Sequence, residues 1–313
     1  MNITDKILQS KYFENQPPVL IDIGASGGIH AIWKSIAGYS CCIAFDADDR
    51  EFQMSDEKNS GYRRLIKINR IVSNQAAGLA EFYLTHSPYC SSLLEPDSEK
   101  LQPWLFKPLF EVKNISRLPS VTIAETLDSL GIHYIDWFKV DTQGTDLRIY
   151  NSLPDTIRDK ILLADFEPGI IDAYKGEDKL YSVMEKMHMQ GFWLSSMQVK
   201  GTQRLQNHYI SQIGDFSSKR IIKTSPCWAE LTYFRNPVQL SCRSLLLMIV
   251  FAMLDHQYGY ALELADLGKT QFDDPLMDEC RKAILKKIQN EKIKLPLILI
   301  KRKLNKLFSS LHA

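Results

Sequence analysis

Two acidic residues and a glycine-rich turn near the start of the chain are spaced as in a nucleotide-binding site. The apolar run Val19–Ile23 contains Asp22 and leads into a turn that carries Gly24 and Gly28. A glycine turn between a strand and a helix lets the backbone approach a ligand and directs helix N–H groups toward it. Asp46 follows the next apolar run, 22 residues after Gly24, where a carboxylate can accept hydrogen bonds from two ribose hydroxyls. Together these residues predict a site for an adenosine-containing ligand; the alternative is a tight turn followed by a merely solvated acid.

A second set of acids follows two later apolar segments. Asp141 ends the segment 135–140, and alternation along a strand over 161–166 places Asp165 and Glu167 on one face. If the two strands are neighbours, Asp141 and Glu167 converge at the same edge of the sheet. Two nearby carboxylates raise each other's pKa, which suits one of them to act as a base near neutral pH. Asp141 and Glu167 are therefore the candidate catalytic residues, unless they only orient a ligand's ammonium group or cap helices.

The segments that must position these residues alternate between apolar strands and amphipathic helices. Beyond the strands already named, the pattern predicts strands near 41–45, 65–72 (with a hairpin partner at 80–84), 192–199 and 227–234, and helices near 29–37, 123–130, 146–153 and 180–190. This alternation predicts an α/β fold with a mostly parallel sheet and helices on both faces.

Two other stretches depart from the alternation. Residues 86–110 contain four prolines and are predicted to form a long loop, which in a compact domain is usually functional or mobile. After Pro237 only helices are predicted, over about 241–265, 274–290 and 296–309. We therefore expect an α/β domain over residues 1–236 and a C-terminal helical extension over 237–313.

Several short segments between residues 17 and 236 match the motifs of a known family in their order and spacing. They are Val19-Leu-Ile-Asp-Ile-Gly-Ala-Ser-Gly-Gly28, Ala44-Phe-Asp46, Ser91-Ser-Leu93, Thr126-Leu-Asp128, Phe138-Lys-Val-Asp-Thr-Gln-Gly144 and Gly191-Phe192. This pattern resembles the FkbM-type methyltransferases. The resemblance implies a Rossmann-like class I methyltransferase fold, S-adenosyl-L-methionine as cofactor, and methylation of a hydroxyl group, often on a sugar or a polyketide-like product. A role in polysaccharide biosynthesis would fit such an activity.

The resemblance also implies roles for individual residues of the first motif. Asp22 and the turn around Gly24, Ala25 and Gly28 would hold the methionine part of the cofactor, and Asp46 would bind the ribose. At the position of Asp46 the family more often has a glutamate followed by proline. The aspartate side chain is one methylene shorter but keeps the carboxylate.

Further along the chain the resemblance implies contacts to the adenine and to the reacting groups. Ser73 and Asn74 would border the adenine, Ser91 and Ser92 lie in a loop that would close over the site, and Asp141 would face the cofactor's ammonium group or the acceptor. After Asp141 the chain has Thr-Gln where Val-Glu is common in the family. This departure removes an acid and weakens any expectation of a metal site.

Composition narrows the class of protein. The 313 residues include 38 Lys and Arg against 37 Asp and Glu, a net charge of +1 that argues against a protein whose main role is to coat nucleic acid. The six cysteines have no metal-ligand spacing and favour a reducing compartment. The start of the chain lacks a signal-peptide pattern, and the longest apolar run, Leu245–Leu254, is too short to cross a bilayer. We expect a cytoplasmic protein without a metal.

The basic residues gather at the C-terminal end. From Arg281 onward there are ten Lys and Arg and one acid, a local charge of +9 that leaves −8 for residues 1–280. Pro296 suits a first helical turn, and the apolar residues that follow it share one helix face: Leu297, Ile300, Leu304 and Leu307. Residues 292–313 could therefore contact an anionic membrane at its inner face. Alternatively, the apolar stripe packs on the helix at 241–265 and the lysines are solvated.

Two other functions stay open. The first is an NAD- or nucleotide-dependent oxidoreductase of Rossmann type, which is disfavoured because Ser26 stands where its G-x-G-x-x-G fingerprint requires glycine. The second is a catalytically idle binding protein tethered by its basic tail.

Overall fold

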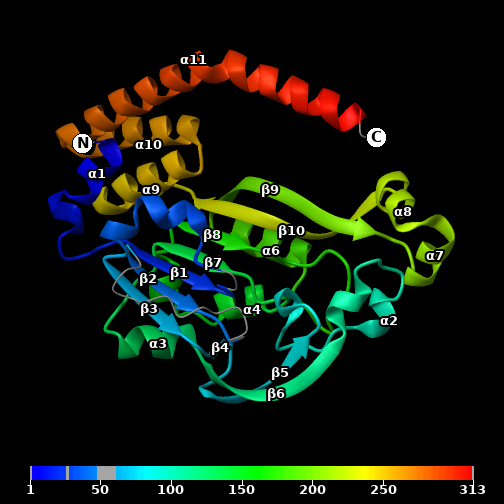
Figure 1. The fold of residues 1–313 in the computed structure, drawn as a ribbon. Coiled ribbons are helices and arrows are strands. Elements are labelled where there is room, and N and C mark those ends of the chain that lie inside the picture. The colour runs from blue at the N-terminus through cyan, green and yellow to red at the C-terminus, as the bar shows by residue number, and fades with distance from the viewer. Residues whose placement is uncertain (1, 26–27, 48–60, 312–313) are drawn as a thin grey trace. The chain divides into compact units, whose positions relative to one another are not determined.

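The chain divides into two units in the computed structural model, which describes residues 2–25, 28–47 and 61–311 (Figure 1). One unit comprises residues 17–236, and the other combines residues 1–16 with 237–313. The boundary after residue 236 lies where the sequence predicts it, but the first sixteen residues belong to the helical unit. The reason is local packing: helix α1 (Ile3–Leu8) packs on the C-terminal helices, and the Tyr12 hydroxyl donates to Asp274 Oδ2 at 2.6 Å.

Seven strands form the central sheet of the larger unit, in the order β3-β2-β1-β7-β8-β10-β9. Their bounds are β1 (Val19–Ile23), β2 (Cys41–Phe45), β3 (Arg64–Ile68), β7 (Trp137–Val140), β8 (Leu163–Phe166), β9 (Phe192–Gln203) and β10 (Thr224–Arg235). The first five in the order pair in parallel, whereas β10 is antiparallel to both β8 and β9. The predicted α/β class with a mostly parallel sheet is thus confirmed, and it is compatible with a Rossmann-like fold.

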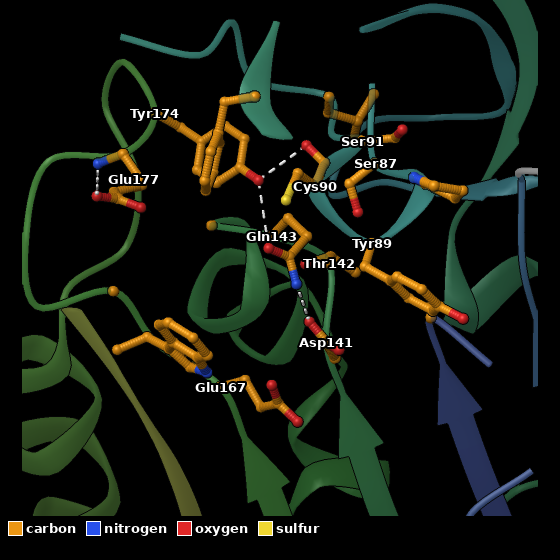
Figure 2. Close-up of a pocket in the computed structure, with 18 of the residues that line it drawn as sticks. Ser87, Tyr89, Cys90, Ser91, Asp141, Thr142, Gln143, Glu167, Tyr174 and Glu177 are labelled. Carbon is orange, nitrogen blue, oxygen red and sulfur yellow. Dashed lines mark hydrogen bonds between the residues drawn. The ribbon is translucent and has the colours of Figure 1, made fainter. Parts of the chain in front are cut away.

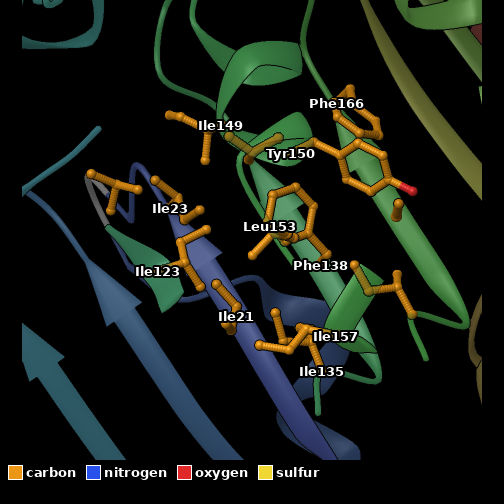
Figure 3. Close-up of a cluster of buried hydrophobic side chains, with 14 of the residues drawn as sticks. Ile21, Ile23, Ile123, Ile135, Phe138, Ile149, Tyr150, Leu153, Ile157 and Phe166 are labelled. Atoms are coloured by element: carbon orange, nitrogen blue, oxygen red, sulfur yellow. The ribbon is translucent and has the colours of Figure 1, made fainter. Parts of the chain in front are cut away.

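The central strands form because their residues are apolar enough to be buried on both faces. Every residue of β1 and of β2 is buried, as expected for interior parallel strands. On one face Ile21, Ile23, Phe138 and Phe166 project into a hydrophobic cluster (Figure 3). Burial of these side chains is the main force that holds the sheet to its helices.

Four helices cover this face, and all but the third, a short helix that was not predicted, are close to their predicted positions. They are α3 (Ile123–Ser129), α4 (Asp146–Asn151), α5 (Asp155–Arg158) and α6 (Leu180–Met189). Helix α3 begins at a capping box, in which Thr122 and Glu125 exchange side-chain and backbone hydrogen bonds. Ile123, Ile149 and Tyr150 from these helices fill the cluster of Figure 3.

On the opposite face of the sheet, the structure of residues 29–37 differs from the predicted helix. The chain forms two 3-10 turns there, η2 (Ala31–Ser35) and η3 (Ala37–Tyr39). Their backbone bonds join residues three apart, as from Trp33 N to His30 O at 3.1 Å. Trp33 packs edge-on against Trp137 of β7, with ring centroids 5.7 Å apart, and this large contact anchors the short segment on the sheet.

A second sheet of three strands corrects another prediction. The expected strand 65–72 is divided between β3 and β4 (Ile71–Val72), and the expected hairpin is wrong. Strand β5 (Gly78–Thr85) pairs instead with β6 (Val112–Val121), in the order β4-β6-β5. The sequence pattern misses β6 because half of its residues are polar, most of them are exposed, and it contains Pro119.

The helical unit contains α9 (Cys242–Leu254), α10 (Tyr258–Gln271) and α11 (Pro275–Leu311) in addition to α1. The predicted helix 241–265 is interrupted between α9 and α10, where His256 has a φ of 58°. The predicted new helix at Pro296 is wrong, since α11 continues through this residue. The predicted apolar stripe beyond it lies outside the described side chains, which end at Ile293. None of the described helices is long and apolar enough to cross a membrane.

The contact between the ends of β1 and β7 generates a prediction about stability. Gly24 has a φ of 82°, and a Cβ at this position would lie 2.0 Å from the backbone oxygen of Asp141. We expect Gly24→Ala to lower the free energy of unfolding by about 2 kcal/mol or more, measured by denaturant titration. Gly38→Ala is the control, since its added Cβ would meet nothing closer than 3.8 Å. Equal stability of the two variants would contradict the proposed steric requirement.

Candidate functional site

A cavity of about 450 Å³ lies in the larger unit, at the edge of the sheet where the parallel strands end (Figure 2). Ile23 and Phe45, the last residues of β1 and β2, line it together with the residues that follow β7 and β8. In an open α/β sheet this edge is where ligands bind, because the loops that leave parallel strands meet there. The volume falls in the range of small-molecule sites.

Four of the predicted site residues line the cavity together: Gly24, Asp46, Asp141 and Glu167. Asp46 is only 6% exposed, and its backbone is held by two hydrogen bonds. Its N–H donates to Ile68 O at 3.2 Å, and its carbonyl accepts from Asn69 Nδ2 at 3.2 Å. The strand ends thus bring these residues to one space although they are far apart in the sequence. Ser91, predicted to lie in a closing loop, also lines the cavity.

The other six predicted binding residues do not line the cavity within the described part of the chain: Asp22, Ala25, Gly28, Ser73, Asn74 and Ser92. The Asp22 carboxylate is fully buried below the cavity. It accepts a hydrogen bond from Lys139 Nζ and another from the backbone N–H of His30, each at 2.8 Å. Ser92 donates to the backbone oxygen of Gln143 at 2.8 Å. Asp22 and Ser92 therefore hold the walls of the cavity in place.

The remaining four predicted residues belong to local packing and turns or are exposed to solvent. Ala25 is buried and packs against Ala44 of β2. Gly28 closes the turn with a φ of 130°. The Ser73 hydroxyl accepts a hydrogen bond from a backbone N–H two residues later, and the next residue, Asn74, is exposed.

Asp141 and Glu167 project into the same space from neighbouring strands (Figure 2). Burial raises the pKa of Glu167 to about 9, and the nearby Asp141 carboxylate adds to the rise. Burial likewise raises the pKa of Asp141, although Lys139 and the side chain of Gln143 oppose this shift. Near neutral pH the pair therefore holds a proton that an isolated pair of carboxylates would have lost.

A buried acid after β7 fixes the distance between these two strand ends. Asp146 Oδ1 accepts hydrogen bonds from the backbone N–H and the hydroxyl of Thr142, at 2.9 and 2.6 Å. Its Oδ2 accepts from the backbone N–H of Glu167 at 3.0 Å. Burial, followed by repulsion from Asp141, raises the pKa of Asp146 to about 7. Its bonds make Asp146 a positioning residue for both strand ends, a role that its place in the sequence did not reveal.

A chain of hydrogen bonds orients the Asp141 carboxylate (Figure 2). Gln143, in the left-handed region with a φ of 56°, donates from Nε2 to Asp141 Oδ1 at 2.5 Å. The Tyr174 hydroxyl lies 2.8 Å from the backbone oxygen of Cys90 and 3.2 Å from Gln143 Oε1, and can donate its proton to either. The contact with Tyr174 directs the amide nitrogen of Gln143 toward Asp141. The glutamine thus supplies a hydrogen-bond donor where a glutamate would add a third negative charge.

Two further acids that the sequence analysis did not single out reach the cavity. Glu230 comes from β10 and forms an ion pair with Lys200 at 3.0 Å. Glu177 is held by Lys179 at 2.6 Å, and burial raises its pKa. Alternation along β10, where Trp228 also lines the cavity, is the one signal that could have indicated Glu230.

The outer part of the cavity has an aromatic wall. The rings of Phe106 and Trp228 lie nearly parallel, at 14°, with centroids 6.3 Å apart, and Phe110 packs edge-on against Phe106 and Tyr174. The described lining contains no histidine, and the described residues form no cluster that could hold a metal ion. Carboxylates are therefore the groups at this site that can accept a proton near neutral pH.

The raised pKa of Glu167 predicts how stability depends on pH. The carboxyl group titrates near 4.5 when unperturbed and near 9 in the folded protein, so the folded state binds the extra proton between these values. The contribution of Glu167 to the free energy of unfolding should therefore fall as the pH rises through this window, by up to about 1.4 kcal/mol per pH unit. We expect Glu167→Gln to flatten this slope in denaturant titrations of the ligand-free protein. The exposed-site control Glu185→Gln should keep the slope, and parallel profiles of all three proteins would contradict the assignment.

Comparisons with known proteins leave the site to be interpreted from its own chemistry, since no protein-family model matches the chain and no curated protein matches its sequence.

Proposed function

We propose that this protein is an S-adenosyl-L-methionine-dependent O-methyltransferase that acts on a hydroxyl group of a sugar, glycan or related metabolite. The observation that carries the proposal is the position of Gly24 and Asp46 at the ends of two adjacent parallel strands, lining one cavity. A glycine turn and an acid in this arrangement suit the methionine and ribose parts of an adenosine-containing ligand.

The strand order supports this proposal over the oxidoreductase alternative. Rossmann dinucleotide-binding sheets have six parallel strands in the order 3-2-1-4-5-6. Here the strand beside β8 is the antiparallel β10, the last strand in the chain, which separates β8 from β9. An antiparallel last strand inserted at this place resembles the class I methyltransferase fold. Calorimetric titration with NAD and with S-adenosylhomocysteine separates the two functions directly.

The chemistry of the cavity fits a cationic cofactor. Four acids besides Asp46 line it, against the single cation Arg70 in the described lining. S-adenosyl-L-methionine, when bound, would supply a methyl group already activated on a sulfonium. Asp46 would bind the ribose, and the backbone at Gly24 would approach the methionine part. Of the other predicted contacts, Asp22 and Ser92 would act only by holding the backbone around the cavity.

The chain's own contribution to the reaction is alignment, exclusion of water and removal of one proton. The aromatic wall of Phe106, Phe110 and Trp228 would help to exclude water from the reacting groups. Asp141, held by Gln143, and Glu167, held at its N–H by Asp146, face the space where an acceptor hydroxyl would lie. The ionised member of this pair would take the hydroxyl proton as the new bond forms.

A cytoplasmic location, with residues 292–313 at the inner face of a membrane, stays a prediction.

The ribose assignment is tested by replacing Asp46. We expect Asp46→Ala to weaken S-adenosylhomocysteine binding by about 2–4 kcal/mol in calorimetry, because charge-assisted bonds to the ribose are lost. Asp273→Ala, which removes an exposed acid in the helical unit, is the matched control and should bind as the parent does. Unchanged affinity of a folded Asp46 variant would refute the assignment.

The two candidate catalytic acids are tested by isosteric replacement. We expect Asp141→Asn and Glu167→Gln each to reduce methyl transfer at least about tenfold, and Glu167→Gln to leave cofactor affinity unchanged. The assay follows labelled methyl transfer from S-adenosyl-L-methionine to glycan extracts, with Glu185→Gln as control. If Glu167 is the base, the rate of the parent should rise with pH toward about 9 and that of Glu167→Gln should not. Parental rates in both variants would exclude these acids, and no transfer by the parent would favour the idle binding protein.

A further inference from the structure

The long antiparallel pair β9 and β10 carries a small helical segment at its tip. Residues 204–223, here called the tip segment, contain η7 (Asn207–Tyr209), α7 (Ile210–Ile213) and α8 (Asp215–Ile221). Figure 1 shows α7 and α8 at the far end of the β9–β10 ribbon, extending away from the central sheet. Short helices in this position have few neighbours with which to bury apolar side chains.

The tip segment nevertheless carries several large apolar side chains in exposed positions. Phe216 is 68% exposed and Ile221 is 79% exposed, and Tyr209 and Ile213 are also exposed. Single exposed apolar residues are common on any protein, but four within thirteen residues form a concentration that needs a partner surface.

Basic residues are interleaved with these apolar side chains. The tip segment contains Arg204, Lys219, Arg220 and Lys223 but only one acid, Asp215, whereas acids outnumber basic residues over 17–236 as a whole. The guanidinium of Arg220 lies 4.1 Å from the ring centroid of Phe216, so a cation and an aromatic ring share one surface. Exposed aromatic and aliphatic groups beside cations match the boundary between anionic headgroups and acyl chains.

A second copy of this chain would fit the tip segment less well. A symmetric contact would bring the same cationic segments together and would oppose their association. Helices of four and seven residues also provide little surface compared with the roughly 800 Å² per partner of a typical stable interface. Charge complementarity therefore favours a bilayer over self-association.

The tip segment is joined to the wall of the cavity. β10 runs from this segment past Trp228 and Glu230, both of which line the cavity. On the other side, the backbone N–H of Leu105 donates to Gln203 O at 3.1 Å, and the Arg204 guanidinium lies 5.9 Å from the ring centroid of Trp104. These contacts connect the tip segment to the loop that supplies the aromatic wall.

We propose that the tip segment docks on the surface of an anionic lipid bilayer through Phe216, Ile221 and the neighbouring cations. Docking there would hold the aromatic wall of the cavity near the lipid surface. Given the proposed function, on which this last step rests, the acceptor would be a hydroxyl group of a sugar that is attached to a membrane lipid.

The docking is tested by co-sedimentation of the full-length chain with vesicles of equal parts phosphatidylglycerol and phosphatidylcholine, and with vesicles of phosphatidylcholine alone. The tip variant is Phe216→Ser/Ile221→Ser. The matched control is Leu79→Ser/Tyr181→Ser, which removes two apolar side chains of similar exposure, 71% and 72%, from β5 and α6. We expect the parent and the control to sediment with the anionic vesicles and the tip variant to bind them at least about tenfold more weakly, because two buried apolar contacts are lost.

Three outcomes would overturn the proposal. The tip variant could sediment as strongly as the parent, which would place any membrane contact elsewhere, such as residues 292–313. The parent could fail to sediment with anionic vesicles at low salt. Gel filtration could show that the parent is an oligomer which the tip variant converts to a smaller species, and the surface would then bind a second copy. Calorimetry with S-adenosylhomocysteine on the same proteins keeps this result separate from failure of the proposed function.

Discussion

The buried Lys139 ammonium is the charge on which the acidic cavity depends. It lies on β7 in register with Asp22 of β1 and donates to that carboxylate at 2.8 Å. Burial lowers the pKa of Lys139, but the carboxylates of Asp22 and Asp141 outweigh this effect and hold it above its usual value. Without this cation, Asp22, Asp141 and Glu167 would place like charges on neighbouring strands of a dry sheet. A buried ion pair adds little net stability, yet loss of one partner is costly because the other charge stays buried and unpaired.

The same cation sets an order among the three acids. Asp22 is paired with Lys139, and the same cation opposes the rise that burial causes in the pKa of Asp141. The pKa of Glu167 is raised to about 9, mainly by burial. A graded set of this kind keeps one proton at the sheet edge near neutral pH. The hydrogen bond from Gln143 favours the ionised form of Asp141, and the bond from the Glu167 N–H to Asp146 fixes the backbone at Glu167.

Strand ends could be predicted from the sequence because parallel strands buried on both faces are continuous apolar runs, and the acids that follow them are conspicuous. Asp46, Asp141 and Glu167 were located in this way. Asp22 was expected at the ligand, but nothing in a single sequence shows that Lys139 lies opposite it. Strand β6 was missed because most of its residues are exposed and leave only a weak period-two signal. Glu230 was missed although its strand was predicted, because the sequence does not show that β10 lies beside β8.

The two halves of the cavity therefore have different origins in the fold. The half beside β1 and β2 is formed by the parallel sheet, whose geometry constrains it closely. The half beside β10 is formed by residues 86–110, which lie outside the central sheet, and by the antiparallel strand β10, which pairs with β8 and β9. In this second half, Glu177 and Glu230 line the cavity together with the aromatic wall, and under the proposed function a phosphate or carboxylate on an acceptor would meet their negative charge at short range. Under the proposed function, an uncharged ring with one apolar face against Trp228 and its hydroxyls toward the acids would meet no such barrier, so the electrostatics of this half would favour an uncharged acceptor.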